Sequence, residues 1–213
     1  MDKEYLSGEN GLTLIECLVA IVVIAATIGM IAPITVMAVA TRVQNQRAEQ
    51  AALIAQSELD RIRLTVERGG NYTLDDVPST SGAIRDVPAP ENVNAANALT
   101  TFDATRPIDI DNDGDNDYAV QTFRTEGDVD ASTGQPIAFE LGVRVYRADA
   151  VEKYTASELS TDQASLLLTS GEGQASIRPL AVLYSTIVKS DNKESLCDYY
   201  RYVDPDATAP SSC

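Results

Sequence analysis

The feature that most constrains this chain is an apolar run over residues 12–40, in which Glu16 is the single charged residue. A run of this length exceeds the roughly 20 residues that a helix needs to cross a hydrocarbon core of about 30 Å. The run therefore predicts one membrane-spanning helix. Because a carboxylate inside such a segment is costly, Glu16 is a candidate functional residue.

Three other kinds of N-terminal segment could contain an apolar run of this kind. A cleavable secretory signal has a positively charged start and a short apolar stretch, whereas residues 1–11 are net acidic and the run is long. A lipoprotein would place Cys17 after a small residue, but the preceding residue is Glu16. A plain signal anchor stays open, and it leaves Glu16 without an explanation.

The residues around the start of the run carry a resemblance. Gly11 is followed by LTLIE and then by the apolar run, and this pattern resembles the class III signal of type IV prepilins and pseudopilins. Pro33 falls where members of that family carry a helix-kinking proline. The resemblance implies that prepilin peptidase cuts after Gly11 and methylates the new amine of Leu12. Residues 1–11 are then a cleaved leader, and the chain is a single-pass inner-membrane protein whose head is periplasmic or extracellular.

Within that family Glu16 has a physical role. Cleavage creates a cationic amine at Leu12 that also lies in hydrocarbon, and the geometry of one helix turn keeps it from the carboxylate of its own chain. A neighbouring subunit can offer the partner charge. Leaving one member of such a buried pair alone costs about 3–5 kcal/mol, so we expect Glu16 to set the register between subunits. The plainer alternative is an acid tolerated near the membrane interface.

The rest of the N-terminal segment predicts a kinked and then amphipathic helix. Gly29 and Pro33 predict a kink or local unwinding, because proline removes a backbone donor and clashes with the preceding turn. Residues 41–68 place apolar side chains three or four apart on one stripe that a sheet must cover: Ala48, Ala51, Ala55, Leu59, Ile62 and Val66. Charged pairs are expected along the exposed face: Glu58 with Arg61, Asp60 with Arg63, and Arg63 with Glu67.

Residues 69–213 form an acidic globular head, with 24 Asp and Glu against 10 Lys and Arg and a net charge of −14. Nucleic-acid binding requires clustered Lys and Arg, so it is not expected. The chain has no histidine and no glycine-rich phosphate loop, which removes the commonest nucleophile pairs and His-ligated zinc. We therefore expect a protein that is not an enzyme.

The fold class predicted for the whole chain is α+β, with a long N-terminal helix packed on a small antiparallel sheet, and the pilin resemblance implies the same arrangement. β-Branched and aromatic residues predict strands at 118–124, 139–146 and 180–188. Residues 71–108 are predicted to form a long loop with little regular structure. A short helix is expected over 156–168, and a turn over 170–176.

The stretch DIDNDGDNDY, residues 109–118, predicts a calcium site. It matches the first half of the D-x-D-x-D-G calcium loop, in which carboxylates at alternate positions and a glycine bend surround one ion. The candidate ligands are Asp109, Asp111, Asp113, Asp115 and Asp117. The twelfth position is Val120 rather than a bidentate Glu, so an EF-hand is not expected. The alternative is a solvated acidic turn.

Cys197 and Cys213 are the only cysteines of the head, and Cys17 lies in the apolar run. The resemblance places the head outside the reducing cytoplasm, and pilins often carry a C-terminal disulfide loop. A Cys197–Cys213 bridge is therefore expected, with free thiols or intermolecular links as alternatives.

These observations together favour a minor pilin or pseudopilin, a structural subunit of a type IV pilus-like or type II secretion-like filament. Its partners would be prepilin peptidase, other pilin or pseudopilin subunits, the inner-membrane assembly platform and membrane lipid. The run APITVMAVATRVQNQR, residues 32–47, resembles cyanobacterial pseudopilins of hormogonium polysaccharide secretion. One alternative is a minor pilin of a motility or adhesion pilus. Another is an uncleaved single-span calcium-binding surface or sensor protein.

Overall fold

The chain is described by a computed structural model, which divides it into two units, Met1–Val43 and Gln44–Cys213. The described residues are 13–68, 72, 76–78, 82–94, 96, 98–130, 132–165, 176–189, 197, 200 and 203–204.

The first unit holds the apolar part of helix α1 (Leu14–Glu67), which is long and apolar enough to cross a membrane. None of its most apolar 18-residue window is buried within the protein. Leu14, Ile21 and Met30 are among many large apolar side chains exposed there. A soluble protein rarely exposes a contiguous apolar surface of this extent, so a lipid environment is the physical expectation.

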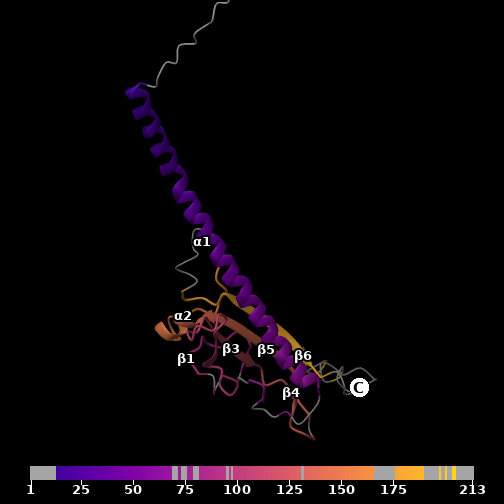
Figure 1. Ribbon diagram of the computed structural model, residues 1–213. Helices are drawn as coiled ribbons and strands as arrows, with labels where there is room; N and C mark the ends of the chain where they lie inside the picture. Colours follow the sequence, from indigo (N-terminus) through magenta and orange to yellow (C-terminus); the bar gives the residue numbers. More distant parts are fainter. Residues whose placement is uncertain are drawn as a thin grey trace, which may run out of the picture. The chain divides into compact units, whose positions relative to one another are not determined.

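The second unit is built on a six-stranded sheet, shown in Figure 1. The strands are β1 (Asn92–Val93), β2 (Ala104–Ile108), β3 (Tyr118–Arg124), β4 (Asp128–Val129), β5 (Pro136–Arg147) and β6 (Ala181–Val188). β1 and β2 pair parallel, whereas β2 with β3, β3 with β5, β4 with β5 and β5 with β6 pair antiparallel. A helix and a predominantly antiparallel sheet confirm the α+β class. The strands predicted at 118–124, 139–146 and 180–188 are confirmed as β3, β5 and β6.

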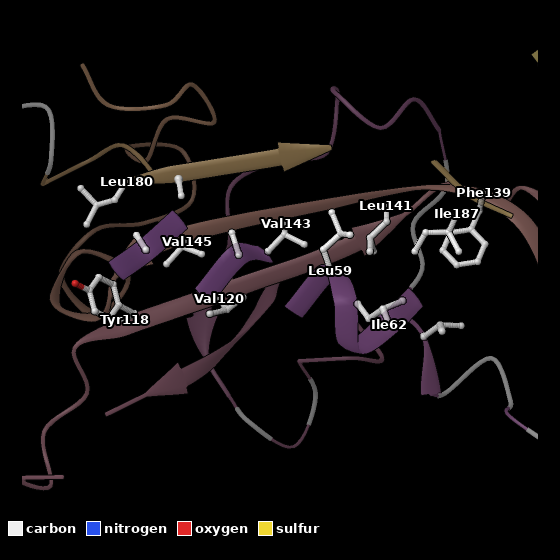
Figure 2. Close-up of a cluster of buried hydrophobic side chains, with 14 of the residues drawn as sticks. Leu59, Ile62, Tyr118, Val120, Phe139, Leu141, Val143, Val145, Leu180 and Ile187 are labelled. Atoms are coloured by element: carbon white, nitrogen blue, oxygen red, sulfur yellow. The ribbon is translucent and has the colours of Figure 1, made fainter. Parts of the chain in front are cut away.

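The last part of α1 packs on one face of this sheet, as the apolar stripe predicted. All six stripe residues are buried, and five of them, from Ala51 to Val66, belong to the main core. Alternate residues of β5 face them, because successive side chains of a strand point to opposite faces; these are Phe139, Leu141, Val143 and Val145 (Figure 2). Each fully buried aliphatic or aromatic side chain contributes about 1.5–3 kcal/mol, so this contact is a main source of the head's stability.

The other face of the sheet is also covered. The intervening residues of β5 include Arg144 and Tyr146, which are fully buried. Residues 84–89 pack over this face, with Ile84 and Val87 against Phe123. The ring of Phe123 fills the space where a side chain at Gly142 would lie, because a Cβ there would be 2.3 Å from the ring. Glycine at this position therefore allows the two central strands to pack.

Two expectations about the head are wrong. Residues 71–108, expected to be a long loop with little regular structure, contribute the strands β1 and β2 to the sheet. The short helix lies at α2 (Ala148–Lys153), directly after β5, and the described residues 156–165 of the predicted helix form turns and bends instead. The predicted turn at 170–176 lies outside the described residues apart from Ser176, which is in a turn.

Candidate functional site

The predicted calcium stretch is the loop that joins β2 to β3. β2 ends at Ile108 and β3 begins at Tyr118, and the N–H of Asp117 donates to the carbonyl of Ile108 at 2.9 Å where the loop closes. Two residues of the loop have left-handed backbone conformations, Asn112 (φ 60°) and Gly114 (φ 98°). Glycine and asparagine adopt this conformation at the lowest cost, which explains the tight bend at these positions.

Three of the five aspartates come together in this loop. Asp109, Asp111 and Asp117 each offer a carboxylate oxygen, and these oxygens lie within 4.8 Å of one another. Calcium binds oxygen at about 2.3–2.6 Å, so oxygens on opposite sides of one ion are up to about 5 Å apart. The three carboxylates therefore fit a single calcium ion without large movements of the backbone.

The backbone of the loop already holds two of these carboxylates. Asp109 accepts hydrogen bonds from the N–H of Asn112 at 2.6 Å and of Gly114 at 3.0 Å. Asp117 accepts one from the N–H of Ile110 at 2.9 Å. Because each carboxylate oxygen has more than one lone pair, these bonds orient the carboxylates and leave acceptor capacity for a cation.

Repulsion between neighbouring carboxylates of the loop affects the pKa of Asp111. The neighbouring Asp113 carboxylate, aided by desolvation and by Asp117 and Asp109, raises the pKa of Asp111 above its ordinary value. A bound divalent cation would reverse this effect, since an opposite charge favours the ionised carboxylate.

The other two predicted ligands lie outside this trio. Asp113 accepts a hydrogen bond from the N–H of Asp115 at 2.9 Å, so one of its oxygens is turned towards the backbone. Both residues are exposed. Three carboxylates are fewer than the six to eight oxygens that calcium takes, and the remainder would come from water, carbonyls or these two aspartates.

Glu16 lies in the first turn of α1 and makes a contact that the sequence analysis missed. Its carboxylate accepts hydrogen bonds from the N–H of Thr13 at 2.8 Å and from the Thr13 hydroxyl at 2.9 Å. The N–H of Glu16 in turn donates to that hydroxyl at 3.4 Å. This is a capping box, which satisfies backbone groups that a helix start leaves free. The T-x-x-E spacing before the apolar run is the signal that could have revealed it.

The other residues singled out from the sequence are the cleavage site, the two helix-kink residues and the three cysteines. Gly11 and Leu12, the predicted cleavage site, lie outside the described residues. α1 runs through both Gly29 and Pro33 without a break, and a bend of the helix there stays a prediction. Cys17 is an exposed free thiol. Cys197 is buried and Cys213 lies outside the described residues, so the disulfide also stays a prediction.

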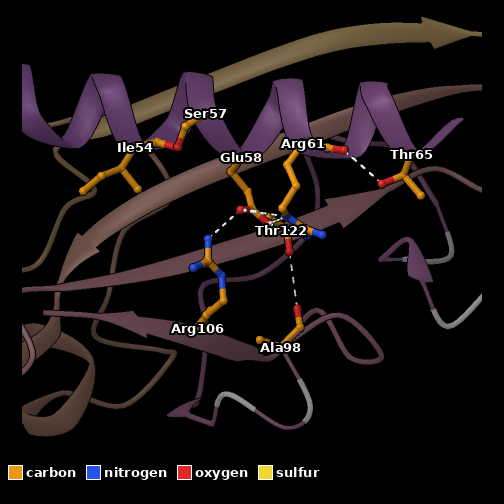
Figure 3. Close-up of polar contacts among 8 residues, drawn as sticks. All are labelled: Ile54, Ser57, Glu58, Arg61, Thr65, Ala98, Arg106 and Thr122. Carbon is orange, nitrogen blue, oxygen red and sulfur yellow. Dashed lines mark hydrogen bonds and ion pairs between the residues drawn. The ribbon is translucent and has the colours of Figure 1, made fainter. Parts of the chain in front are cut away.

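An ion-pair cluster around one buried carboxylate joins α1 to β2 (Figure 3). The side chain of Glu58 is only 2% exposed, and its carboxylate contacts Arg61 at 2.7 Å and Arg106 at 2.5 Å. The predicted Glu58–Arg61 pair is therefore present, with a buried carboxylate and an arginine whose side chain is 43% exposed. Arg63 pairs with Asp60 at 3.4 Å as predicted. Among the described residues no ion pair joins Arg63 to Glu67.

Arg144 is a buried cation that sequence reasoning did not single out. Its guanidinium donates to the carbonyls of Val87 at 2.8 Å and Pro88 at 3.2 Å, and it lies 4.5 Å from the centre of the Phe123 ring. An arginine between two valines in the middle of a predicted strand is the signal that could have found it. Its contacts anchor residues 87–88 to the sheet, which makes its role structural.

Comparisons of the chain with protein-family models, with curated proteins and with solved structures gave no match.

Proposed function

We propose that the chain is a minor pilin or pseudopilin, a structural subunit of a type IV pilus-like or type II secretion-like filament in the inner membrane. The observation that carries this proposal is the order of features along one helix. The sequence Gly11-Leu12 precedes a helix with Glu16 in its first turn, and an exposed apolar stretch is followed by a stripe buried on a β-sheet. In this proposal the chain has no catalytic role.

The two parts of α1 support this proposal because they face different surroundings. The stripe from Ala48 to Val66 is buried within the head, whereas the apolar side chains that the structure describes between residues 14 and 39 are exposed. Lipid suits the exposed part in an unassembled subunit, and neighbouring subunits suit it in a filament. A head that faces the periplasm or the exterior follows from the resemblance of residues 11–16 to the prepilin signal.

The experiment that tests the proposal is mass spectrometry of the N-terminus of the native protein. The expected mature chain begins at Leu12 with a methylated amine. A Gly11→Leu variant is expected to keep its leader, because a bulky side chain would obstruct the peptidase, and a Ser7→Leu variant is the matched control. A native chain that still begins at its leader would overturn the proposal.

Glu16 is proposed to pair with the amine of a neighbouring subunit, and its capping box permits a sharper test than a simple truncation. Glu16→Gln keeps a side chain suited to the capping box but removes the charge. Thr13→Ala removes the cap but keeps the charge. If charge pairing between subunits matters, Glu16→Gln reduces incorporation into filaments and Thr13→Ala does so much less. The opposite order would assign Glu16 to helix capping alone.

Calcium binding by the 109–117 loop and a Cys197–Cys213 disulfide belong to the same proposal. The convergence of three carboxylates supports the first. A bridge over about 17 residues would stabilise the head by near 3 kcal/mol in the chain-entropy model. Two free head thiols in the purified native protein would contradict it.

A second candidate function is an uncleaved, single-span calcium-binding surface or sensor protein. The acidic loop favours it, because that loop needs no filament to act. The N-terminal mass separates the two functions, since this candidate keeps residues 1–11. For the pilin proposal, a role of the filament in polysaccharide secretion is supported by the resemblance of residues 32–47 alone.

A further inference from the structure

β6 leaves one edge of the sheet open. It pairs with β5 on one side, from Ala138↔Val188 to Ala181↔Val145. In the described part of the chain no strand pairs with its other side. Apart from the ladder to β5, its hydrogen bonds to other described segments are two side-chain contacts, from Arg63 to the Ser185 hydroxyl and from Arg144 to the Tyr184 hydroxyl.

The register shows which backbone groups this edge offers. The N–H of Lys189 donates to the carbonyl of Ile137 at 2.8 Å, so the odd-numbered residues of this strand direct their backbone groups towards β5. Because the direction alternates along an antiparallel strand, the even-numbered residues direct theirs outward. The outward N–H and C=O groups therefore belong to Val182, Tyr184 and Thr186.

The edge has none of the features that usually protect such strands. Natural edge strands are short, or carry charges, prolines or bulges that prevent pairing with another chain. β6 has eight residues, AVLYSTIV, with no charge, proline or glycine. Its pairing with β5 runs from end to end without a bulge. A strand added by a partner is the arrangement that these groups can accept.

Two arginines flank the middle of this edge, one on each face of the sheet. On the α1 face, the guanidinium of Arg63 donates to the Ser185 hydroxyl at 3.2 Å. On the opposite face, the guanidinium of Arg85 lies 4.9 Å from the centre of the Tyr184 ring. Because Tyr184 and Ser185 are neighbours on the strand, the two cations lie at the same level of β6, on opposite faces of the sheet.

The charges around the edge identify the kind of partner. Arg85 is exposed and has no ion pair among the described residues, whereas Arg63 is shared with Asp60. Glu140 is the acid opposite β6 in the register, across from Thr186. A second copy of the chain would bring the same two arginines to this edge, so self-pairing would place like charges near one another.

We propose that the outer edge of β6 binds an extended acidic segment of a partner protein by strand addition. Two adjacent acidic residues of that segment would point to opposite faces of the sheet, one towards Arg63 and one towards Arg85. The backbone of Val182, Tyr184 and Thr186 supplies the affinity, and the two arginines supply the preference for acids. This inference does not depend on leader cleavage or on a filament.

The test uses the full-length protein in detergent micelles and three fluorescent peptides. The first peptide is TVTVEEVTVT, the second is TVTVKKVTVT, and the third is the first with alternate backbone amides methylated. The expected result is that the acidic peptide binds at least about tenfold more tightly than the other two, a difference that charge complementarity and backbone pairing readily supply. Equal binding of the acidic and basic peptides, or no binding, would overturn the proposal.

Variants of one residue separate backbone pairing from other contacts. Thr186→Pro removes an outward N–H without touching the ladder to β5, and it is expected to weaken binding of the acidic peptide at least about tenfold. Thr186→Val keeps the N–H and is expected to bind as the wild type does. Arg63→Ala/Arg85→Ala is expected to abolish the preference for acids. Unchanged binding in Thr186→Pro would overturn strand addition.

Amide hydrogen exchange of the wild-type chain supplies a measurement that does not depend on a variant's folding. Bound acidic peptide is expected to slow exchange at Tyr184 and Thr186, whose N–H groups face outward. Exchange at Leu183 and Ser185, whose N–H groups face β5, is expected to change little. Protection of neither pair would overturn the proposal.

Discussion

The Glu58 cluster and the 109–117 loop place carboxylates in opposite circumstances within the same head. Glu58 is buried and contacts two guanidinium groups from α1 and β2. The loop carries five exposed or half-exposed aspartates. In the part of the chain that the structure describes, its carboxylates accept hydrogen bonds from backbone N–H groups and have no ion pair with Lys or Arg. One carboxylate is neutralised by the chain itself, and five are left for solvent or a cation.

The difference follows from the cost of burial. A charge that leaves water must be paired and hydrogen-bonded, so Glu58 requires its arginines wherever the helix packs on the sheet. Exposed carboxylates remain solvated, and their mutual repulsion is moderate and screened by salt. The Glu58 cluster therefore contributes to the stability of the head, whereas the repulsion within the loop depends on the salt and cations in the surrounding solution.

The largest effect is expected from removing the partners of Glu58. An Arg61→Ala/Arg106→Ala variant leaves the buried Glu58 carboxylate without its ion-pair partners. Because both arginine side chains are partly exposed, the expected loss of unfolding free energy is about 3 kcal/mol, the lower end of the range for a broken buried pair. Urea unfolding of residues 44–213 measures the change. Glu58→Leu in the same background is expected to recover most of the loss, because the unpaired charge is gone. A double variant as stable as the wild type would show that Glu58 reaches water and would remove the contrast with the loop.

Calcium is expected to stabilise the same fragment through the loop. Binding that is specific to the folded state adds about 2.7 kcal/mol at a hundredfold excess over the dissociation constant. An Asp109→Asn/Asp111→Asn variant should lose this gain while its melting temperature in chelator stays equal to or above that of the wild type, because repulsion is relieved. Asp162→Asn is the matched control, since Asp162 is an exposed aspartate that does not belong to the trio. An unchanged wild-type melting temperature in millimolar calcium would leave the stretch as a solvated loop.

The smallest effect is a pH dependence of stability that arises in the loop. The pKa of Asp111 is raised in the folded state, mainly by Asp113, so the folded state holds this proton more tightly than the unfolded state. Without calcium, stability is therefore expected to fall slightly as the pH rises through the window between the ordinary and the raised pKa. Calcium affinity is expected to weaken as the pH falls through that raised pKa. Asp113→Asn should reduce both trends, measured by calcium titration and melting between pH 3 and 7.

Residues governed by burial periodicity were predictable from the sequence. The stripe from Ala48 to Val66 and the alternation from Phe139 to Val145 both follow a simple repeat, and each is buried as expected. β3 could be placed correctly because its composition is typical of a strand. The aspartate trio also follows from spacing, although its members depend on how the loop turns at Asn112 and Gly114.

Features that depend on tertiary contacts could not be predicted in this way. β2 contains Pro107, which argues against a strand, but the register places its missing N–H on the side away from β3, beyond the end of β1. The expected helix over 156–168 begins with a single turn in which Glu158 accepts from Thr155 at 2.9 Å. The N–H of Ser160 then donates to Ile177 at 2.7 Å, and this contact ends the turn.

The two margins of the sheet differ in a way that limits the size of any complex formed there. At the far margin, β1 has only two residues, and Val93 packs against the cluster that includes Ala150 and Val151 of α2. A sheet with one closed margin can accept a single strand but cannot grow from both sides. Complexes formed by strand addition should therefore saturate at one peptide per chain, and they should not extend into fibrils.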